Sequence, residues 1–157
     1  EIFTALQTGV IDATEWVGPY NDRAFGLHKA AKYYYFPGWH EPGPTIESII
    51  NKDAYNKLPE DLRLIIDVSC KAANIDMLSD YTAKNNLALQ FLKSKNIEIL
   101  SFPNEVLAKL KSLSREILKE ISQKDTITKE VYDSYMTFNK SVTPWTEISD
   151  KAYLNIK

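Results

Sequence analysis

The 157-residue sequence has one cysteine, two histidines and five glycines. A single cysteine excludes an internal disulfide framework and a thiolate cluster of the kind that holds structural zinc. Cys70 falls within a helical pattern, where its expected role is that of a small packing residue. The glycines form no phosphate-binding loop, and there is neither a serine nucleophile elbow nor a His-Glu zinc motif. The common motifs for phosphate binding, zinc binding and covalent catalysis are therefore missing.

A strong net charge and a long apolar run are missing as well. The net charge is -2 with a sequence pI near 5.7, and Lys and Glu alternate along the chain, so a nucleic-acid partner is not expected. No run approaches the roughly 18 uninterrupted apolar residues of a membrane span, and no signal-peptide pattern is found. With 44% hydrophobic and 25% charged residues, the composition is that of a globular domain large enough to bury a core.

The first residues read as the end of a helix. The chain lacks an initiator methionine, and residues 1–8 form a helical pattern that stops at Gly9, a glycine in the C-cap position. We therefore expect that a preceding portion of the protein has been cleaved, lost or left out.

Hydrophobic periodicity predicts an α/β arrangement built around one long helix. The long helix is expected over residues 59–95, with Pro59 at its start, and a short helix over 52–57. Asn21 or Asp22 is expected to cap a helix that runs to about residue 31, and Asp125 or Thr126 another. Strands are expected at 10–17, 33–36, 45–51 and 97–102, and C-terminal helices at about 103–124, 126–139 and 141–157. These strands are too few and too short to form a full sheet alone.

Residues 12–44 concentrate the aromatic and irregular features of the chain. They hold two of the three Trp, four of the nine Tyr, both His and four of the five Gly residues. At each end of this stretch an apolar run stops at a Gly/Pro breaker, beside Glu15 and Trp16 at one end and Trp39, His40 and Glu41 at the other. Aromatic walls with a few placed polar groups are typical of a small-molecule pocket. Two aromatic turns that pack the edge of a core are the structural alternative.

Glu15 and Glu41 admit more than one chemistry. Two carboxylates can act as general acid and base, can supply oxygen ligands to a hard cation, or can be solvated side chains with no role in a site. Their spacing alone does not choose among these, and a hydrolase that uses both is the least favoured reading. His28, alone on a helical face, is expected to have a satisfied or surface role rather than a ligand role.

Three segments resemble a known family. ALQTGVIDA (5–13) with EWVGPY (15–20), YYYFPGWHE (33–41) and NKDAYNKLP (51–59) are similar to the solute-binding proteins of tripartite ATP-independent periplasmic (TRAP) transporters. They look like the branch associated with 2-oxo acids, other carboxylates and mannitol or chloroaromatic substrates. The resemblance covers essentially the whole chain.

The resemblance implies a fold and a function. In this family two α/β lobes close on an organic acid and deliver it to a sodium-driven membrane permease. Residues 1–157 would then be a single fragment, the C-terminal half of a two-lobe periplasmic-binding-protein fold with a long helix and a helical C-terminal region. The protein would be a periplasmic, non-enzymatic receptor whose signal peptide lies in the missing N-terminal part.

The resemblance also implies a site. In the oxo-acid branch a bound cation helps to hold the substrate carboxylate, and by similarity Glu15, Glu41 and the backbone carbonyl of Trp16 fall on the metal positions. Such oxygen ligands suit Na or Ca, and a cation lets acidic groups accept an anion. Glu15, Trp16 and Trp39 are the expected substrate contacts. In members of the family, the arginine that pairs with the substrate carboxylate lies in the N-terminal half of the protein. We therefore assign this role to none of Arg23, Arg63 and Arg115.

The C-terminal region raises a second possibility. Members of this branch pair through a long C-terminal helix, and Trp145, Ile148 and Tyr153 form an apolar stripe that is suited to a homodimer face. The same stripe could equally pack on its own lobe. The alternative function is a truncated, ligand-incompetent fragment that acts as a dimerisation or interaction module.

Overall fold

The computed structural model describes residues 1–41, 43 and 46–156, and the chain divides into two compact units, unit 1 (Glu1–Phe102) and unit 2 (Pro103–Lys157). Unit 1 consists, in chain order, of α1 (Ile2–Thr8), α2 (Pro19–Phe25), the 3₁₀ helix η1 (Leu27–Lys29), β1 (Tyr33–Phe36), α3 (Lys52–Asn56), α4 (Glu60–Ser94) and β2 (Glu98–Ser101). Unit 2 consists of α5 (Asn104–Ile121), α6 (Thr126–Ile148) and α7 (Asp150–Leu154).

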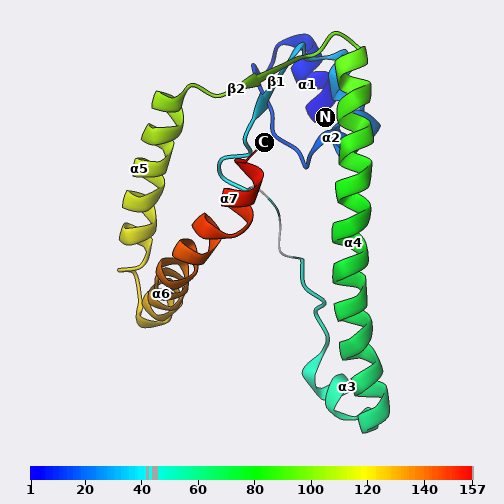
Figure 1. The fold of residues 1–157 in the computed structure, drawn as a ribbon. Coiled ribbons are helices and arrows are strands. Elements are labelled where there is room, and N and C mark those ends of the chain that lie inside the picture. The colour runs from blue at the N-terminus through cyan, green and yellow to red at the C-terminus, as the bar shows by residue number, and fades with distance from the viewer. Residues whose placement is uncertain (42, 44–45, 157) are drawn as a thin grey trace. The chain divides into compact units, whose positions relative to one another are not determined.

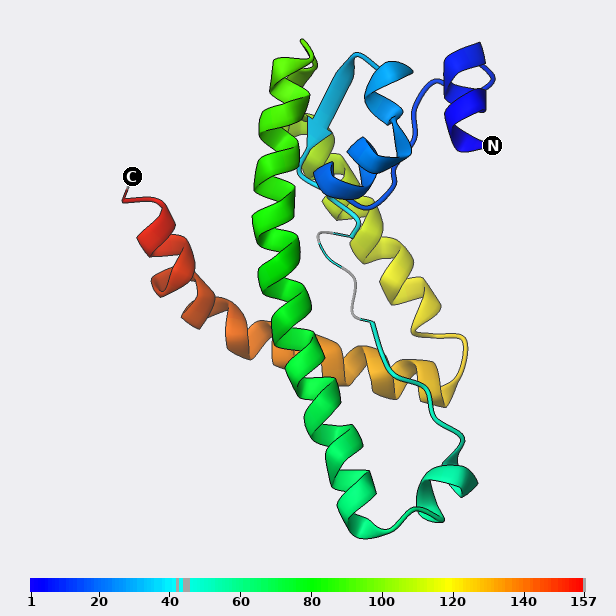
Figure 2. The ribbon, with the colours of Figure 1, turned by 90° about the vertical axis from the view of Figure 1, so that its right-hand side faces the viewer.

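The core of unit 1 lies at the C-terminal end of α4. There α2 packs against the helix, and β1 pairs in parallel with β2, from Tyr33 opposite Glu98 to Phe36 opposite Ser101 (Figure 1). Figure 2 shows the same grouping from the side, with β1 and α2 beside the last turns of α4. Among the described residues, the buried apolar side chains are Leu27, Ala88 and Leu92. The connection from β1 to β2 thus crosses over through α4, as parallel strands require.

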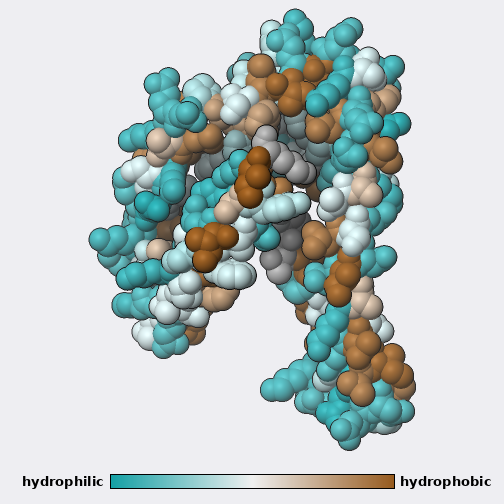
Figure 3. Space-filling view, in the orientation of Figure 1, coloured by the Kyte–Doolittle hydropathy of each residue, from teal (hydrophilic) through white to brown (hydrophobic). Residues whose placement is uncertain are grey.

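The long helix was predicted almost to the residue, since α4 starts one residue after Pro59 and ends one before Lys95. Its N-terminal half, next to α3, carries apolar side chains that are exposed and appear brown in Figure 3. They are Leu62, Leu64, Ile65, Val68, Ile75 and Leu78. Cys70 is also exposed, so its expected packing role is wrong for this structure.

Unit 2 is helical, as predicted, but its helices have different limits. The Asp125 carboxylate accepts a hydrogen bond from the backbone N–H of Thr128 at 2.7 Å and caps α6, which confirms the predicted cap. The expected break near residue 140 is wrong, because α6 continues through Pro144 to Ile148. A proline removes one backbone donor but does not always end a helix. Lys157, the last residue of the expected C-terminal helix, lies outside the described residues.

Two of the predicted strands are wrong. Residues 10–17 and 46–51 have no strand structure, and Thr45 lies outside the described residues. Both segments have the β-branched residues of a strand but no partner to pair with in the described part of the chain. The helix expected from Asn21 or Asp22 instead begins at Pro19, with Gly18 as its N-cap, and ends at Gly26.

Helices α4, α5 and α6 are long enough to cross a lipid bilayer. None of the helices in the described ranges, however, is apolar enough to do so.

Candidate functional site

The segment that carries Glu15 and Trp16 is an irregular turn that enters α2. The Trp16 ring packs against Phe25 of that helix, with ring centroids 5.3 Å apart, and is still 43% exposed. Within the described residues, no backbone N–H donates to the Trp16 carbonyl oxygen. A carbonyl without such a donor keeps its lone pairs available to a ligand or a cation.

The segment that carries Trp39, His40 and Glu41 follows β1 and a cis peptide bond between Phe36 and Pro37. His40 Nε2 lies 3.5 Å from Glu15 Oε2, so this segment meets the first one. The Trp39 ring lies beside His40, at 5.0 Å between centroids. The two segments are therefore in contact through His40, a residue for which no role was predicted.

Asp22 is a buried carboxylate just behind the Glu15–Trp16 turn, and it is only 7% exposed. Its Oδ1 accepts from the backbone N–H groups of Val17 and Gly18, both at 3.4 Å, and its Oδ2 accepts from the Tyr34 hydroxyl at 2.7 Å. Burial raises the pKa of the Asp22 carboxyl above its ordinary value, and the charge of Glu15 adds to that rise. The three hydrogen bonds act in the opposite direction.

Tyr34 is the residue of β1 that turns inward, whereas Tyr33, Tyr35 and Phe36 are exposed. Burial and the bond to Asp22 raise the pKa of Tyr34, so its phenol stays protonated and donates. The pairing of Tyr34 with Asp22 was not predicted from the sequence. Only the backbone bonds of Asp22 had a local signal, because an acidic residue in the first turn after Gly-Pro can accept from the backbone at the start of its own helix.

A third contact ties the turn to α4. The Tyr20 backbone N–H donates to Asn85 Oδ1 at 2.9 Å, and the Tyr20 and Tyr81 rings meet edge to face at 6.0 Å. Gly18 lies at φ 157° and ψ 176°, a region that only glycine adopts easily. A Cβ at this position would meet Asn85 Oδ1 at 3.4 Å. The turn is therefore held by α2, β1 and α4 together.

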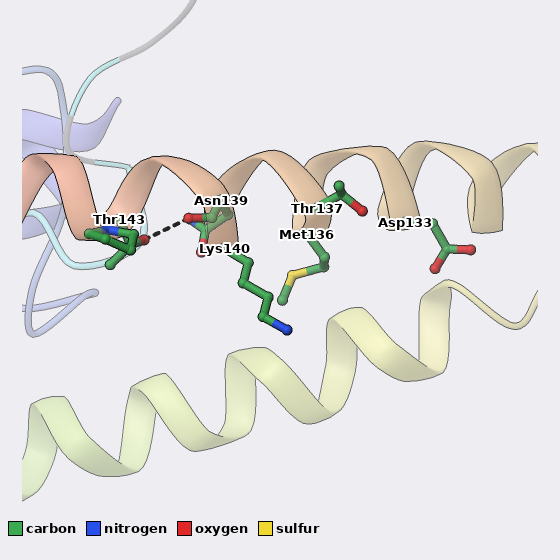
Figure 4. A pocket seen from close by; sticks show the side chains of 7 residues that line it. Asp133, Met136, Thr137, Asn139, Lys140 and Thr143 are labelled. Carbon is green, nitrogen blue, oxygen red and sulfur yellow. Dashed lines mark hydrogen bonds between the residues drawn. The ribbon is translucent and has the colours of Figure 1, made fainter.

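The two best-defined hollows of the described residues lie away from the predicted site residues. One groove is lined by α6 alone, and Figure 4 shows its side chains along that helix, where the Thr143 hydroxyl bonds to the Asn139 carbonyl at 2.7 Å. A second hollow is lined by residues 28–32 and 95–97. Neither includes Glu15, Trp16, Trp39 or Glu41. Over residues 1–41, 43 and 46–156, no three His, Cys, Asp or Glu side chains gather as a metal site.

The residues that line the second hollow include Lys29, Lys32 and Lys95, and the Phe91 ring nearby is contacted by two basic side chains. The Arg23 guanidinium lies 4.0 Å from the centre of the Phe91 ring, and Lys95 Nζ lies 5.3 Å from it. His28 meets the same ring edge to face, at 5.3 Å between centroids. Burial lowers the pKa of His28, and the positive charges of Lys29, Lys95 and Arg23 lower it further.

Comparison with known proteins identifies relatives of the chain. The family model DctP, described as bacterial extracellular solute-binding protein, family 7, matches residues 1–125. The monocarboxylate 2-oxoacid-binding periplasmic protein of Nostoc sp. (strain PCC 7120) is 39% identical over 155 residues, which are 99% of this chain. The chain spans only 43% of the length of that relative.

Solved structures agree with this match. A TRAP transporter solute binding protein from Bordetella bronchiseptica RB50 is 34% identical with a TM-score of 0.93, over 99% of this chain and 46% of that one. Its structure is a mixed occupancy dimer, which has an active site with bound copurified calcium and picolinate and also an apo site. A TRAP periplasmic solute binding protein from Chromohalobacter salexigens, with bound (S)-(+)-2-amino-1-propanol, is 22% identical with a TM-score of 0.64, over 90% of this chain and 44% of that one, and supports the fold alone. The predicted fold class, part of the two-lobe TRAP receptor fold, is confirmed.

Proposed function

Because this chain belongs to the bacterial extracellular solute-binding protein family 7 (DctP), we propose that it is the C-terminal portion of a periplasmic TRAP receptor. The receptor captures a small organic carboxylate of the 2-oxo acid type with a metal cation and passes it to a membrane permease. It is a binding protein and not an enzyme. The binding of a 2-oxo acid by the Nostoc relative and of picolinate by the Bordetella protein supports this substrate class, since both ligands are small carboxylates.

The observation that carries the proposal is the contact between His40 and Glu15. It joins two segments that lie far apart in sequence and each end in an aromatic residue and a carboxylate. Trp16 and Trp39 are both partly exposed there. Exposed aromatic side chains of this kind suit a binding site that a ligand and an opposing lobe would cover. Glu15, Trp16 and Trp39 are the proposed substrate contacts.

The donor set of this chain fits a hard cation. Glu15 and Glu41 supply carboxylate oxygens and Trp16 supplies a carbonyl oxygen, which are ligand types that Ca or Na prefers. Three oxygens are fewer than the 6 to 8 that Ca takes, so the remainder would come from the substrate, water and the rest of the receptor. The copurified calcium of the Bordetella protein supports Ca as the first ion to test. When bound, the cation would neutralise two acidic side chains and make an anionic ligand acceptable beside them.

Isothermal titration of the complete receptor tests the function. Pyruvate, lactate and longer 2-oxo acids are titrated into protein loaded with Ca or Na, and again after chelation or exchange of the ion. We expect binding of at least one 2-oxo acid that weakens at least tenfold when the cation is removed. No heat with any of these acids, with either ion present, would refute the proposal.

The alternative function, a dimerisation or interaction module without a ligand, is supported by a different observation. Trp145, Ile148 and Tyr153 in unit 2 are all more than 60% exposed, and such an apolar stripe is suited to a second copy of the chain. Light scattering of the wild type and of a Trp145→Ser variant separates the two functions. A monomeric protein that still binds a carboxylate would exclude the module as the main role.

A further inference from the structure

We propose that Asp22 and Tyr34 are positioning residues for the cation, which they serve by holding the Glu15–Trp16 turn against β1. The inference deepens the proposed function and rests on it. Neither side chain would contact the ion or the substrate. Their role would be to fix the spacing between the Trp16 carbonyl and the segment that carries Glu41.

The hydrogen bonds of Asp22 join two separate parts of the site. One carboxylate oxygen accepts from the backbone of Val17 and Gly18, which directly follow Trp16, and the other accepts from Tyr34 of β1. The segment that carries Glu41 leaves from the end of the same strand. The bridge therefore links the Glu15–Trp16 turn to the strand that leads to Glu41, and the His40–Glu15 contact links the same two segments a second time.

The chemistry of the bridge indicates a purpose beyond packing. Burying a carboxylate is unfavourable, and no Lys, Arg or His of the described residues forms an ion pair with Asp22. An apolar residue would fill the same space without this cost. What an apolar residue could not do is accept three donors from two chain segments and so fix the backbone that presents the Trp16 carbonyl.

The chain offers a matched control for this bridge. Tyr55 donates its hydroxyl to Asp67 Oδ1 at 2.9 Å, so it forms another tyrosine–aspartate pair, but one that is exposed and joins α3 to α4. Figure 1 shows α3 at the end of α4 opposite to α2 and β1. The Tyr55→Phe variant removes a tyrosine hydroxyl that donates to an aspartate, as Tyr34→Phe does, but it leaves the Glu15–Trp16 turn unchanged.

The experiment measures Ca affinity of the complete receptor by titration calorimetry and by tryptophan fluorescence, and the Tm in chelator. Asp22→Ala is expected to weaken Ca binding by roughly 10- to 100-fold and Tyr34→Phe by about tenfold, as loss of groups that orient metal ligands does. Asp22→Asn keeps an acceptor for the turn and should lose less than Asp22→Ala. The double variant should bind as Asp22→Ala does, because both changes remove one shared contact. Tyr55→Phe should bind Ca as the wild type does.

Each outcome has a distinct meaning. A lower Tm in chelator with unchanged Ca affinity of the folded protein would show a purely structural bridge and overturn the positioning role alone. A wild-type receptor that binds neither cation nor carboxylate would overturn the proposed function and, with it, this inference. If Asp22→Ala does not fold, Tyr34→Phe decides, because it removes only one hydroxyl. Equal Ca affinity in Tyr34→Phe and the wild type would also overturn the positioning role.

Discussion

Replacing Glu15 with glutamine should weaken the binding of the cation strongly, although the size and shape of the side chain hardly change. The Glu15→Gln change keeps the length and one carbonyl oxygen of the side chain, so it chiefly removes a negative charge. Because the proposed ion sits against that charge, the loss of binding free energy should be proportional to the charge of the ion. A divalent ion should therefore lose more affinity than a monovalent one.

The exposure of Glu15 sets the magnitude. The side chain is 57% exposed in this chain, so a dielectric constant near that of water gives the smallest expected loss. A carboxylate charge about 2.4 Å from Ca contributes about 3.5 kcal/mol at this dielectric, and half as much for Na. These energies correspond to a loss of roughly 300-fold for Ca and roughly 20-fold for Na.

The assay is competition between the two ions in the complete receptor, followed by tryptophan fluorescence and calorimetry. Glu60→Gln is the matched control, because Glu60 is an exposed carboxylate in the first turn of α4 and lies at the opposite end of that helix from α2. It should leave both affinities unchanged. Equal losses of Ca and Na in Glu15→Gln, or none, would refute the electrostatic reasoning and remove Glu15 from the cation site.

Three further predictions concern stability. Leu92→Ala should lower the free energy of unfolding by about 2–5 kcal/mol, because Leu92 is 2% exposed, whereas Leu87→Ala, at a position that is 61% exposed, should change it by less than about 0.5 kcal/mol in denaturant titrations. Asp125→Ala should reduce helicity by circular dichroism, and Asp125→Asn, which keeps an acceptor for the Thr128 N–H, should not. Hydrogen bonds from Thr128 hold the pKa of Asp125 below its ordinary value, so its stabilising effect should be lost as acid protonates it. The lowered pKa of His28 makes the unfolded state bind more protons below a pH of about 6.5, so acidification should destabilise the wild type more than His28→Gln in thermal unfolding.

Local sequence patterns predicted α4 and the start of α6 well. The pattern of α4 starts after a proline and is long enough to outweigh local exceptions, and the cap at Asp125 depends only on residues that follow it directly. Gly9 likewise adopts the left-handed C-cap conformation that its position indicated, with φ 74°. Such features are set within a few residues along the chain, so no knowledge of tertiary neighbours was needed.

Features that depend on distant partners were predicted less well. Residues 10–17 have strand-like composition, but a strand forms only where another strand supplies its hydrogen bonds, and the sequence does not say whether one is present. The candidate site shows the same division. Glu15, Trp16, Trp39 and Glu41 were identified from local composition and family resemblance, and their roles in binding stay predictions. The bridge from Asp22 to Tyr34 joins positions in different elements, which only the folded structure could reveal.

The parallel pairing of β1 with β2 sets an order of events for folding. Residues 37–97, which include all of α4, separate the two strands, so the ladder closes a long loop before it gains its first contact. The local turns of α4 can form much sooner than this closure. We infer that the helix nucleates unit 1 and that the strand end leading to Glu41 is placed last, so ligand competence should lag behind the recovery of helical signal during refolding.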